Sequence, residues 1–500
     1  MNTLDNDFGR LGAPARAYIE REHGLLIDGK TRATASRYDI IDPTSGQPFA
    51  TAAEANEGDV ADAVAAARCA LTGPWARMRP NERQNCLLRM AALLDQNGAE
   101  ISEIAAVESG RLLGNTRGID VDYSNHFLTY MAGWATKIEG RTTALSMPYI
   151  PDGELDGFTF REPIGVVAAI VPWNVALGIA IWKIAPALAA GCTIVLKPAP
   201  QTPLATLRFA ELALEAGVPE GVLNIITGSA PELGSALVRH PDVDKITFTG
   251  STQTGRLIKQ ATADSFKSVS MELGGKSPFL IMEDADLDRA IPAAAWAIFG
   301  NHGQNCCAGS RLYVHKRHYE HVLEGVSEIA RSISLGSPLL PETQMGPLAN
   351  HQQRERVLGY IEAGRTQGAR VVTGGHAPDH RGAYVEPTIL ADVTSDMTPV
   401  CEEIFGPVLV AAAFETDQEA LRLANDTEYG LGASVWSKDL DRVRAMTRGL
   451  EAGSVWVNVH NALDMALPFG GWKNSGQGFD LGQESVLGHT RVKAVVHHYP

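Results

Sequence analysis

The sequence predicts an α/β protein built around a doubly wound parallel sheet. From residue 164 to 261, apolar runs rich in β-branched residues alternate with helix-like runs, and a second series follows from residue 277 to 458. Runs of this kind are typical of parallel strands that helices cover on both faces. The chain of 500 residues is long enough for about two or three domains.

Helical periodicity precedes the first series and covers residues 56–135. The first series then holds four strand-like runs, each followed by a helix-like run, which is the pattern of a nucleotide-binding domain. We expect its strands at 164–171, 192–198, 222–228 and 245–250, and its helices at 179–191, 202–217, 231–240 and 252–261. Residues 164–182 are uncharged and long enough to cross a membrane, but the turn that starts at Pro172 interrupts them, so no membrane span is expected.

The second series begins after a boundary that we place at residues 271–276. Its strands are expected at 277–282, 311–315, 408–414, 433–437 and 454–458, and its helices at 292–302, 318–332 and 352–364. Residues 490–500 form one more strand-like run, with no helix after it. A terminal strand of this kind often pairs with a remote segment or with another subunit.

The composition argues against several classes of function. The formal net charge is −15 and no run of five like charges occurs, so we expect no nucleic-acid partner and no polybasic membrane anchor. The six cysteines form no CxxC pair and lack metal-ligand spacing, so neither a disulfide framework nor a metal site is expected. Residues 1–10 contain no apolar stretch and predict no signal peptide. These features favour a reducing, cytoplasmic location.

Two positions have the chemistry of a nucleophile and of a base. Cys306 and Cys307 lie in a glycine-rich turn, and a thiolate attacks carbonyl carbons well, although most free cysteines are simply buried small residues. Glu272 ends an apolar strand, where desolvation would raise its pKa and suit it to act as a general base. The alternative for Glu272 is an ion-paired strand end. The residues alone leave these alternatives open.

Three further places suit the binding of an oxyanion or a phosphate. Asn174 lies between a strand and a helix, where its amide could donate to an oxyanion or cap the helix. Gly250 and Ser251 lie in a strand–turn–helix segment whose helix N-terminus could bind a pyrophosphate, although its GSTQTG spacing is not the GxGxxG fingerprint. Lys197 ends a strand and could bind a ribose or a phosphate, or could be exposed to solvent.

Taken together, motifs along the chain resemble those of the aldehyde dehydrogenase superfamily over residues 25–495. The motifs agree in order and spacing: PWN at 172–174, WK at 182–183, KPA at 197–199, FTGST at 248–252, MELGGK at 271–276, GQNC at 303–306, EEIFGP at 402–407 and PFGGWKNSG at 468–476. The resemblance implies a Rossmann-type cofactor domain, an α/β catalytic domain and a small β oligomerisation segment. The cofactor domain would comprise residues 1–143 and 163–274, and the catalytic domain residues 275–470. The oligomerisation segment would comprise residues 144–162 and 471–500.

The resemblance also implies a role for each matching residue. Catalysis would involve Cys306 as the nucleophile, Glu272 as the base that activates water, Asn174 with the Cys306 backbone N–H as oxyanion donors, and Lys183 as support for the site. The cofactor, NAD or NADP, would be bound by Trp173, Lys197, Gly250, Ser251, Glu403 and Phe405. A homodimer or homotetramer would oxidise an aldehyde to the carboxylic acid through a thioester that water hydrolyses.

Two other functions are compatible with such a fold. In CoA-acylating semialdehyde dehydrogenases, CoA rather than water accepts the acyl group, and those relatives often lack the glutamate found here as Glu272. A non-catalytic structural or binding homologue would be expected to lose Cys306, Glu272 or Asn174, and all three are present.

Some positions depart from common members of the family. Pro200 stands where many NAD-specific members carry a glutamate that pairs with a ribose hydroxyl, so a 2′-phosphate would be repelled less strongly. Asp480 stands where many members have a glutamate that helps to relay a proton, and its side chain is shorter.

The substrate tunnel implied by the resemblance is apolar. Val175 replaces an aromatic residue that often follows PWN, which would make the tunnel roomier. The tunnel would be lined by Val175, Trp182, Leu463 and Phe469. Residues 457–471 resemble members that act on arylacetaldehydes, which predicts a hydrophobic or aromatic aldehyde as the substrate.

Overall fold

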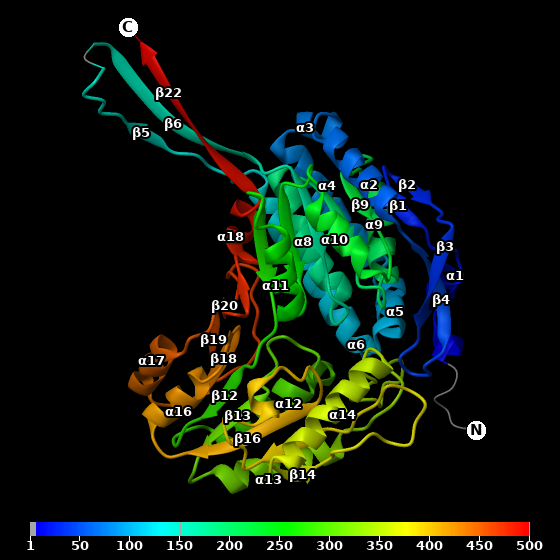
Figure 1. Cartoon of the computed structure of the whole chain (residues 1–500), viewed down its shortest axis with the longest axis vertical. Coiled ribbons are helices and arrows are strands. Elements are labelled where there is room, and N and C mark those ends of the chain that lie inside the picture. Colours follow the sequence, from blue (N-terminus) through cyan, green and yellow to red (C-terminus); the bar gives the residue numbers. More distant parts are fainter. Residues whose placement is uncertain (1–6, 151, 500) are drawn as a thin grey trace.

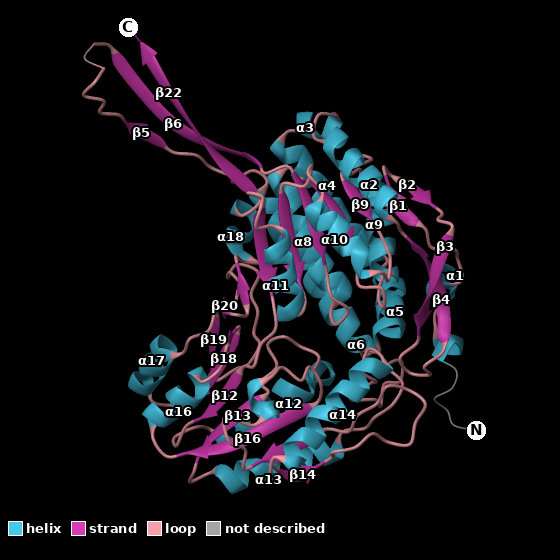
Figure 2. Cartoon of the chain, in the orientation of Figure 1, coloured by secondary structure: helices cyan, strands magenta, loops and turns pink. Residues whose placement is uncertain are grey.

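Two α/β units and a projecting β arm make up the protein (Figures 1 and 2). The computed structural model describes residues 7–150 and 152–499. Two predictions fall partly outside the described residues. The segment without a signal peptide includes residues 1–6, and the predicted terminal strand includes residue 500, none of which is described. Among the described residues, no helix combines the length and the apolar character that a membrane crossing requires.

The first unit contains an eight-stranded sheet of order β2-β1-β9-β8-β7-β10-β11-β21. Its central strands β9, β8, β7, β10 and β11 are parallel, which confirms the doubly wound α/β prediction. The strands are β1 Leu25–Ile27, β2 Lys30–Arg32, β7 Val166–Ile170, β8 Thr193–Lys197, β9 Leu223–Ile225, β10 Lys245–Thr249, β11 Ser268–Glu272 and β21 Gly476–Gln477. The predicted helices are α8 Ala176–Ala190, α9 Leu204–Glu215, α10 Pro231–Arg239 and α11 Thr252–Ala261.

Helices cover both faces of this sheet. Val166 and Ala168 of β7 pack in the core cluster that contains α10, whereas Val167 and Ala169 pack in the cluster that contains α8. This alternation explains why the strands are continuously apolar in sequence. The remaining helices of this unit are α1 Ala13–Ile19, α2 Glu57–Ala70, α3 Pro74–Arg77, α4 Pro80–Gln96, α5 Gly98–Ser109, α6 Leu113–Asn115, η2 Thr116–Tyr123, α7 Ser124–Trp134 and α18 Gly482–Leu487, with η1 at Asp7–Arg10.

The second unit contains a seven-stranded sheet of order β14-β15-β16-β13-β12-β18-β19. Its strands are β12 Pro278–Ile281, β13 Arg311–His315, β14 Arg370–Thr373, β15 Thr388–Ala391, β16 Val408–Phe414, β18 Gly432–Trp436 and β19 Ser454–Val457. Its helices are α12 Leu287–Phe299, α13 Tyr319–Ser332, α14 His351–Thr366, α15 Thr398–Cys401, α16 Asp417–Asn425 and α17 Leu440–Gly449. β11 belongs to the first sheet and β12 to the second, so the chain passes from one unit to the other between Glu272 and Pro278. The assignment of the first unit to cofactor binding and of the second to catalysis stays a prediction.

One predicted helix ends earlier than expected. The helix expected at 292–302 is α12, which begins at Leu287 and ends at Phe299. Asn301 and His302 adopt left-handed backbone angles, with φ of 49° and 59°, within the short η3 segment Gly300–Gly303. An α-helix cannot continue through that conformation, so the prediction for residues 300–302 was wrong.

A three-stranded antiparallel arm projects from the first unit (Figure 1). It consists of β5 Thr142–Ala144, β6 Glu154–Pro163 and β22 Thr490–Tyr499. The predicted terminal strand therefore exists as β22, and it pairs along its whole length with β6, a remote segment of the same chain. Two small sheets complete the fold, formed by β3 Ser36–Ile41 with β4 Pro48–Glu54, and by β17 Tyr429–Gly430 with β20 Trp472–Lys473.

Candidate active site

The loop that carries Cys306 follows a tight left-handed turn after α12. Gly303 has φ of 67°, and a Cβ at this position would lie 2.0 Å from the backbone oxygen of Gly406, so no side chain fits here. Asn301 fixes the turn by donating from Nδ2 to the backbone oxygens of Gln304 (2.8 Å) and Asn174 (3.3 Å). The turn thereby ties the loop to the segment between β7 and α8.

The two neighbouring cysteines have different surroundings. Cys306 is half-buried and lines a cavity of about 250 Å³ between the two units, whereas Cys307 is 1% exposed and packs in the core. Their sulfur atoms are 3.9 Å apart. A hydrogen bond with Cys306 and burial raise the pKa of the Cys307 thiol well above its usual range. Cys306 is therefore the thiol that a ligand in the cavity can reach.

Asn174 does not cap α8, so the capping interpretation was wrong. The N-cap residue of α8 is Val175, and no side chain caps that end. Asn174 is buried and donates from Nδ2 to the backbone oxygen of Gln304 at 3.0 Å. An amide carries two N–H bonds, so a second donor remains at Nδ2. Because Asn174 also lines the cavity with Cys306, it can donate to an oxygen bound there.

Glu272 is the last residue of β11 and is 4% exposed. Among the described residues, neither of its carboxylate oxygens has a hydrogen-bond or ion-pair partner, so the ion-paired alternative was wrong. Burial raises the pKa of Glu272 well above its usual range, and the charges of Asp480 and Cys306 raise it further, while Lys183 acts in the opposite direction. Such a carboxyl group is suited to take a proton near neutral pH.

Lys183 and Asp480 form a buried ion pair next to Glu272. The Lys183 Nζ atom lies 2.5 Å from an Asp480 carboxylate oxygen, and both side chains are 5% exposed or less. Asp480 also pairs through its backbone with Phe469, at 2.7 and 2.8 Å. The side chain of Asp480 therefore reaches Lys183, although it is shorter than that of a glutamate.

The same cavity is lined by most of the residues predicted to bind the cofactor. Trp173 and Phe405 are in an edge-to-face contact, with ring centroids 5.3 Å apart, and Phe405 has φ of 60°. Glu403 accepts a hydrogen bond from Gly275 N–H at 2.9 Å, and burial raises the pKa of Glu403 to about 7. The cavity lining comprises Pro172, Trp173, Asn174, Ile179, Thr249, Gly250, Ser251, Leu273, Gly274, Cys306, Gln353, Arg356, Glu403 and Phe405.

A second cavity, of about 470 Å³, lies over the ends of β7 and β8. Its polar lining comprises Lys197, Ser229, Ser235, Arg239, Thr254 and Gln260. Lys197 is 8% exposed and donates to the backbone oxygen of Gly228 at 3.0 Å, so it is not a solvated strand end. Burial lowers the pKa of Lys197 to about 8. Cationic and hydroxyl groups in one cavity fit a ribose or a phosphate.

Ser251 and Gly250 begin α11 between these two cavities. The Ser251 hydroxyl is the N-cap and accepts from Thr254 N–H at 3.2 Å. Gly250 donates its N–H to the backbone oxygen of Glu272 at 3.0 Å, which ties this turn to the strand of the candidate base. A pyrophosphate would be stabilised at this helix N-terminus.

Aromatic side chains gather beside the ion pair. Trp182 lies 6.0 Å from Phe469 between ring centroids, 6.3 Å from Tyr123 and 6.4 Å from Phe127. The partly buried residues packed on the same core include Val175, Trp182, Leu463 and Cys306. The four residues predicted to line a tunnel thus all pack on the core of the first unit, and none of them is among the residues that line the cavity beside Cys306. Tyr123 and Phe127 were missed, because their spacing of four residues is also that of an ordinary helix face.

Two other residues of the site were also missed. Arg111 is buried, pairs with Asp120, and donates from Nε to Asn301 Oδ1 at 2.9 Å, so it holds the turn before Cys306. Gln353 of α14 donates from Nε2 to the backbone oxygen of Phe405 at 2.8 Å. No local sequence signal identifies them, because each acts through a contact made only in the folded chain.

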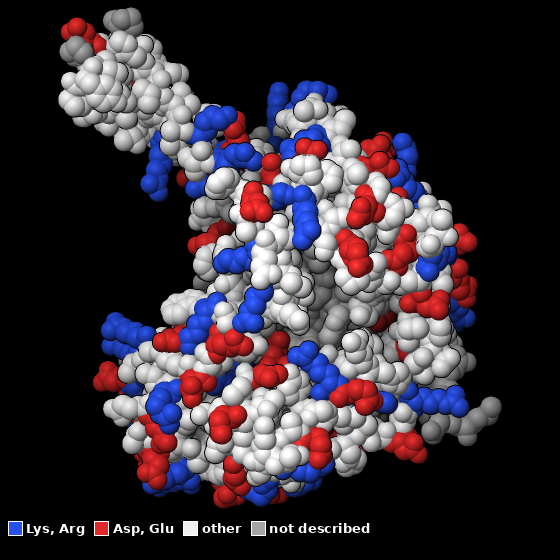
Figure 3. All heavy atoms as spheres, in the orientation of Figure 1, with Lys and Arg blue, Asp and Glu red and all other residues white. Residues whose placement is uncertain are grey.

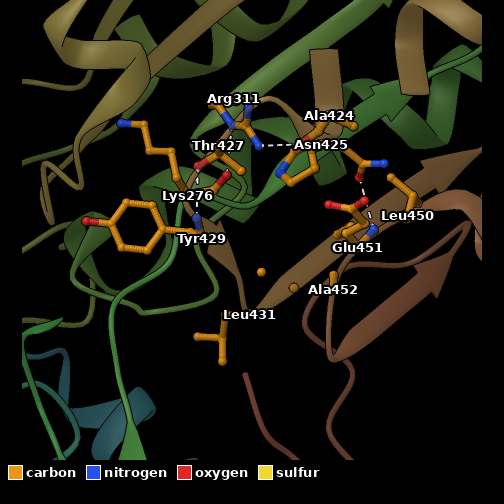
Figure 4. A pocket seen from close by; sticks show the side chains of 14 residues that line it. Lys276, Arg311, Ala424, Asn425, Thr427, Tyr429, Leu431, Leu450, Glu451 and Ala452 are labelled. Carbon is orange, nitrogen blue, oxygen red and sulfur yellow. Dashed lines mark hydrogen bonds between the residues drawn. The ribbon is translucent and has the colours of Figure 1, made fainter. Parts of the chain in front are cut away.

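A third, much smaller cavity of about 10 Å³ lies behind the site (Figure 4). Lys276, Arg311, Asn425 and Tyr429 are among its lining residues. Arg311 is fully buried and donates to the backbone oxygen of Ala424 at 2.7 Å. This cavity has room for about one water molecule and not for a substrate.

Comparisons with known proteins identify the family of the chain. A model described as the aldehyde dehydrogenase family matches residues 30–495. The phenylacetaldehyde dehydrogenase of Pseudomonas fluorescens is 45% identical over 488 residues, which cover 97% of each chain. An aldehyde dehydrogenase of Bacillus cereus, solved as an NAD+ complex, is 42% identical with a TM-score of 0.95, covering 98% of this chain and 99% of the other.

An indole-3-acetaldehyde dehydrogenase of P. syringae, solved with NAD+ and IAA, is 39% identical with a TM-score of 0.93, covering 97% of this chain and 99% of that one. With a family match over most of its length and relatives above 40% identity, the chain belongs to the aldehyde dehydrogenase family.

Proposed function

We propose that this protein oxidises a hydrophobic or aromatic aldehyde to its carboxylic acid with NAD(P)+, through a thioester on Cys306 that water hydrolyses. One observation carries the proposal. The half-buried Cys306 and the amide of Asn174 line one cavity, and the buried, unpartnered carboxyl of Glu272 is close enough to Cys306 for the cysteine to raise its pKa. A nucleophile, an oxyanion donor and a base in one place define an acyl-transfer site.

The residues of this chain have the following roles in the mechanism. The Cys306 thiolate attacks the aldehyde carbon, and Asn174 Nδ2 with the Cys306 backbone N–H stabilises the oxyanion; one such donor is worth about 3–4 kcal/mol in other enzymes. When bound, NAD(P)+ supplies the hydride acceptor, and loss of hydride leaves the acyl group on sulfur. Glu272 then takes a proton from water, the hydroxide attacks the thioester carbon, and the Cys306 thiolate leaves.

Two cavities provide the groups that would hold the cofactor. Lys197, Ser229 and Arg239 line the larger cavity and would bind the ribose and a phosphate. Gly250 and Ser251 would face the pyrophosphate, and Trp173, Glu403 and Phe405 would hold the nicotinamide ribose and ring. The NAD+ complexes of the B. cereus and P. syringae relatives support NAD as the cofactor.

Steady-state oxidation of a panel of aldehydes tests the proposal. We expect phenylacetaldehyde to exceed acetaldehyde at least tenfold in kcat/KM, because the phenyl group is buried against the apolar region around Trp182 and Phe469, at about 25 cal/mol per Å². Val175→Phe should reduce that advantage by filling the tunnel, and Val175→Ile is the matched control that adds one carbon. Higher kcat/KM for betaine aldehyde or succinic semialdehyde than for phenylacetaldehyde and hexanal would contradict the assigned substrate class.

The choice between NAD and NADP is expected to depend on residue 200. The polar lining of the ribose cavity includes the cations Lys197 and Arg239. Pro200→Glu would bring a carboxylate close to a 2′-phosphate, and like charges in a partly desolvated cleft repel. We expect the ratio of kcat/KM for NADP to that for NAD to fall about tenfold, or about 1.4 kcal/mol. Pro200→Gln is the uncharged control, and an equal fall in both variants would show that charge is not the cause.

We also propose that the protein forms a homodimer or a homotetramer and is located in the cytoplasm. The arm surface in Figure 3 carries few charged side chains, and Val492, Val496 and Tyr499 of β22 are about half exposed. β22 is an edge strand with one hydrogen-bonded neighbour, β6, and such an edge is commonly covered by a second chain. All six cysteines are free, which fits a reducing compartment.

A further inference from the structure

The turn between β9 and α10 is held by a carboxylate from a remote part of the chain. Glu54, the last residue of β4, accepts hydrogen bonds from the backbone N–H groups of Ser229 (2.8 and 3.0 Å) and Ala230 (3.2 Å). It also accepts a hydrogen bond from the Ser229 hydroxyl at 2.8 Å. The residue before Ser229 must be small, because a Cβ on Gly228 would lie 2.9 Å from Glu54 Oε1. Glu54 therefore takes up the hydrogen-bond donors of this turn.

This turn forms one wall of the cavity proposed to bind the adenosine ribose of the cofactor. Ser229, Ala230 and Lys197 all line that cavity. Lys197 Nζ donates to the backbone oxygen of Gly228 at 3.0 Å, so the lysine and Glu54 bind neighbouring residues of one turn. Burial lowers the pKa of Lys197, and the negative charge of Glu54 acts against that shift. The two charges thus interact, and Glu54 reduces the positive potential that Lys197 creates in the cavity.

The hydrogen bond to Glu54 decides what the Ser229 hydroxyl can offer to a ligand. A hydroxyl has one proton and two lone pairs, and an ionised carboxylate can only accept, so the Ser229 proton points to Glu54. Toward the cavity the Ser229 oxygen then presents lone pairs only. Such an oxygen accepts a hydrogen bond from a ribose hydroxyl, but it repels the oxygens of a phosphate, which are acceptors.

The backbone of the same turn is also closed to a phosphate. N–H groups in a turn before a helix commonly bind phosphate oxygens. Here the N–H groups of Ser229 and Ala230 are bonded to Glu54. A phosphate at this wall would have to displace a carboxylate that has the same sign of charge.

We propose that Glu54 sets the cofactor preference of the protein and directs it to NAD rather than NADP. This role rests on the proposed function, in which the cavity binds the adenosine ribose. The 2′-hydroxyl of NAD donates to the Ser229 oxygen, whereas the 2′-phosphate of NADP meets lone pairs, occupied N–H groups and a second negative charge. Glu54 thereby rejects the phosphate, although residue 200 is a proline and supplies no carboxylate.

Binding of two nucleotides tests this role without any turnover. Titration calorimetry gives the Kd of 5′-AMP and of adenosine 2′,5′-bisphosphate, which differs from it only by the 2′-phosphate. We expect the unmodified protein to bind 5′-AMP more tightly. Glu54→Gln keeps the shape of the side chain, removes its charge and places an amide N–H against Ser229, which turns the hydroxyl proton toward the cavity. The ratio of the two Kd values should shift about tenfold in favour of the bisphosphate.

Asp284→Asn is the matched control. Asp284 accepts from the Ser437 hydroxyl at 2.9 and 3.0 Å and from the N–H groups of Lys438 and Asp439 at 2.7 Å. It therefore holds a turn in the same way as Glu54, but in the second unit, whereas the residues that line the ribose cavity belong to the first. This variant should leave the ratio of the two Kd values unchanged.

The outcomes separate the role of Glu54 from the proposed function. An unchanged ratio in Glu54→Gln overturns that role, as does an equal shift in Asp284→Asn, or bisphosphate binding by the unmodified protein as tight as that of 5′-AMP. If Glu54→Gln does not fold, Ser229→Ala is measured. It should weaken 5′-AMP binding about fivefold and bisphosphate binding much less, and an equal loss for both overturns the role of Glu54. Absence of binding of either nucleotide to the unmodified protein overturns the proposed cofactor site, and the role of Glu54 with it.

Discussion

Replacement of Cys306 by alanine is expected to abolish aldehyde oxidation, with a fall in kcat/KM of at least about 10⁴-fold. The thiol at this position lines the cavity, and without it no covalent bond forms from which the hydride can leave. The residual rate, measured by absorbance of the reduced cofactor with phenylacetaldehyde, should equal that of a reaction without enzyme.

Cys307→Ala is the matched control for that experiment. Its thiol packs in the core 3.9 Å from the Cys306 sulfur, so this variant should keep most of the activity and lose some stability. Titration with a thiol reagent should show one reactive thiol fewer in Cys306→Ala only, because the exposed thiols of Cys69 and Cys401 react in both variants. If Cys307→Ala were inactive and Cys306→Ala active, Cys307 and not Cys306 would be the nucleophile.

Glu272→Gln is expected to give one burst of reduced cofactor, near one equivalent per site, and then to stall. Acylation of Cys306 precedes the step that needs a base, and a positioned base usually contributes about 10²–10⁴-fold. In the unmodified protein the base works only when ionised, so deacylation should accelerate as the pH rises through its raised pKa. The variant, which has no such carboxylate, should lose this pH dependence.

Rapid mixing of enzyme, cofactor and aldehyde measures the burst, and mass spectrometry should detect the acyl adduct on Cys306 after the stall. Glu272→Asp is the control that keeps the charge on a shorter side chain, and it should recover part of the steady rate. Loss of the burst itself would mean that Glu272 acts earlier, on the thiol.

The alternating parallel core and the terminal strand could be predicted from the sequence, whereas β6 and several short strands could not. β7, β8 and β10 are buried on both faces, and so they appear as continuous apolar runs. β6 is largely half-buried, and its ELDGFTFREP sequence has no apolar periodicity that would separate it from a loop. The short strands β1 and β2 were missed for a different reason, since a three-residue strand is too short to show a period.

The types of residue in the candidate site could be predicted from the sequence, but the contacts between these residues could not. The sequence left open whether Asn174 caps a helix and whether Glu272 is ion-paired, and only the folded surroundings exclude both. The contact between Arg111 and Asn301 joins residues 190 positions apart, and Gly303 is required in the turn because the backbone of Gly406 lies against it. Interactions of this kind have no local pattern.

The position of Asp480 has a consequence for the order in which the protein folds. Lys183 and Asp480 are 297 residues apart in the sequence, and β21 closes the edge of the β11 strand that presents Glu272. During synthesis from the N-terminus, Lys183 and the strands β7 to β11 leave the ribosome long before β21 and Asp480 exist. A nascent chain that lacks residues 476–489 therefore exposes the edge of β11 and buries an unpaired lysine. The base acquires its environment only at the end of translation, and truncated chains should be recognised by proteases and not accumulate as partly active enzyme.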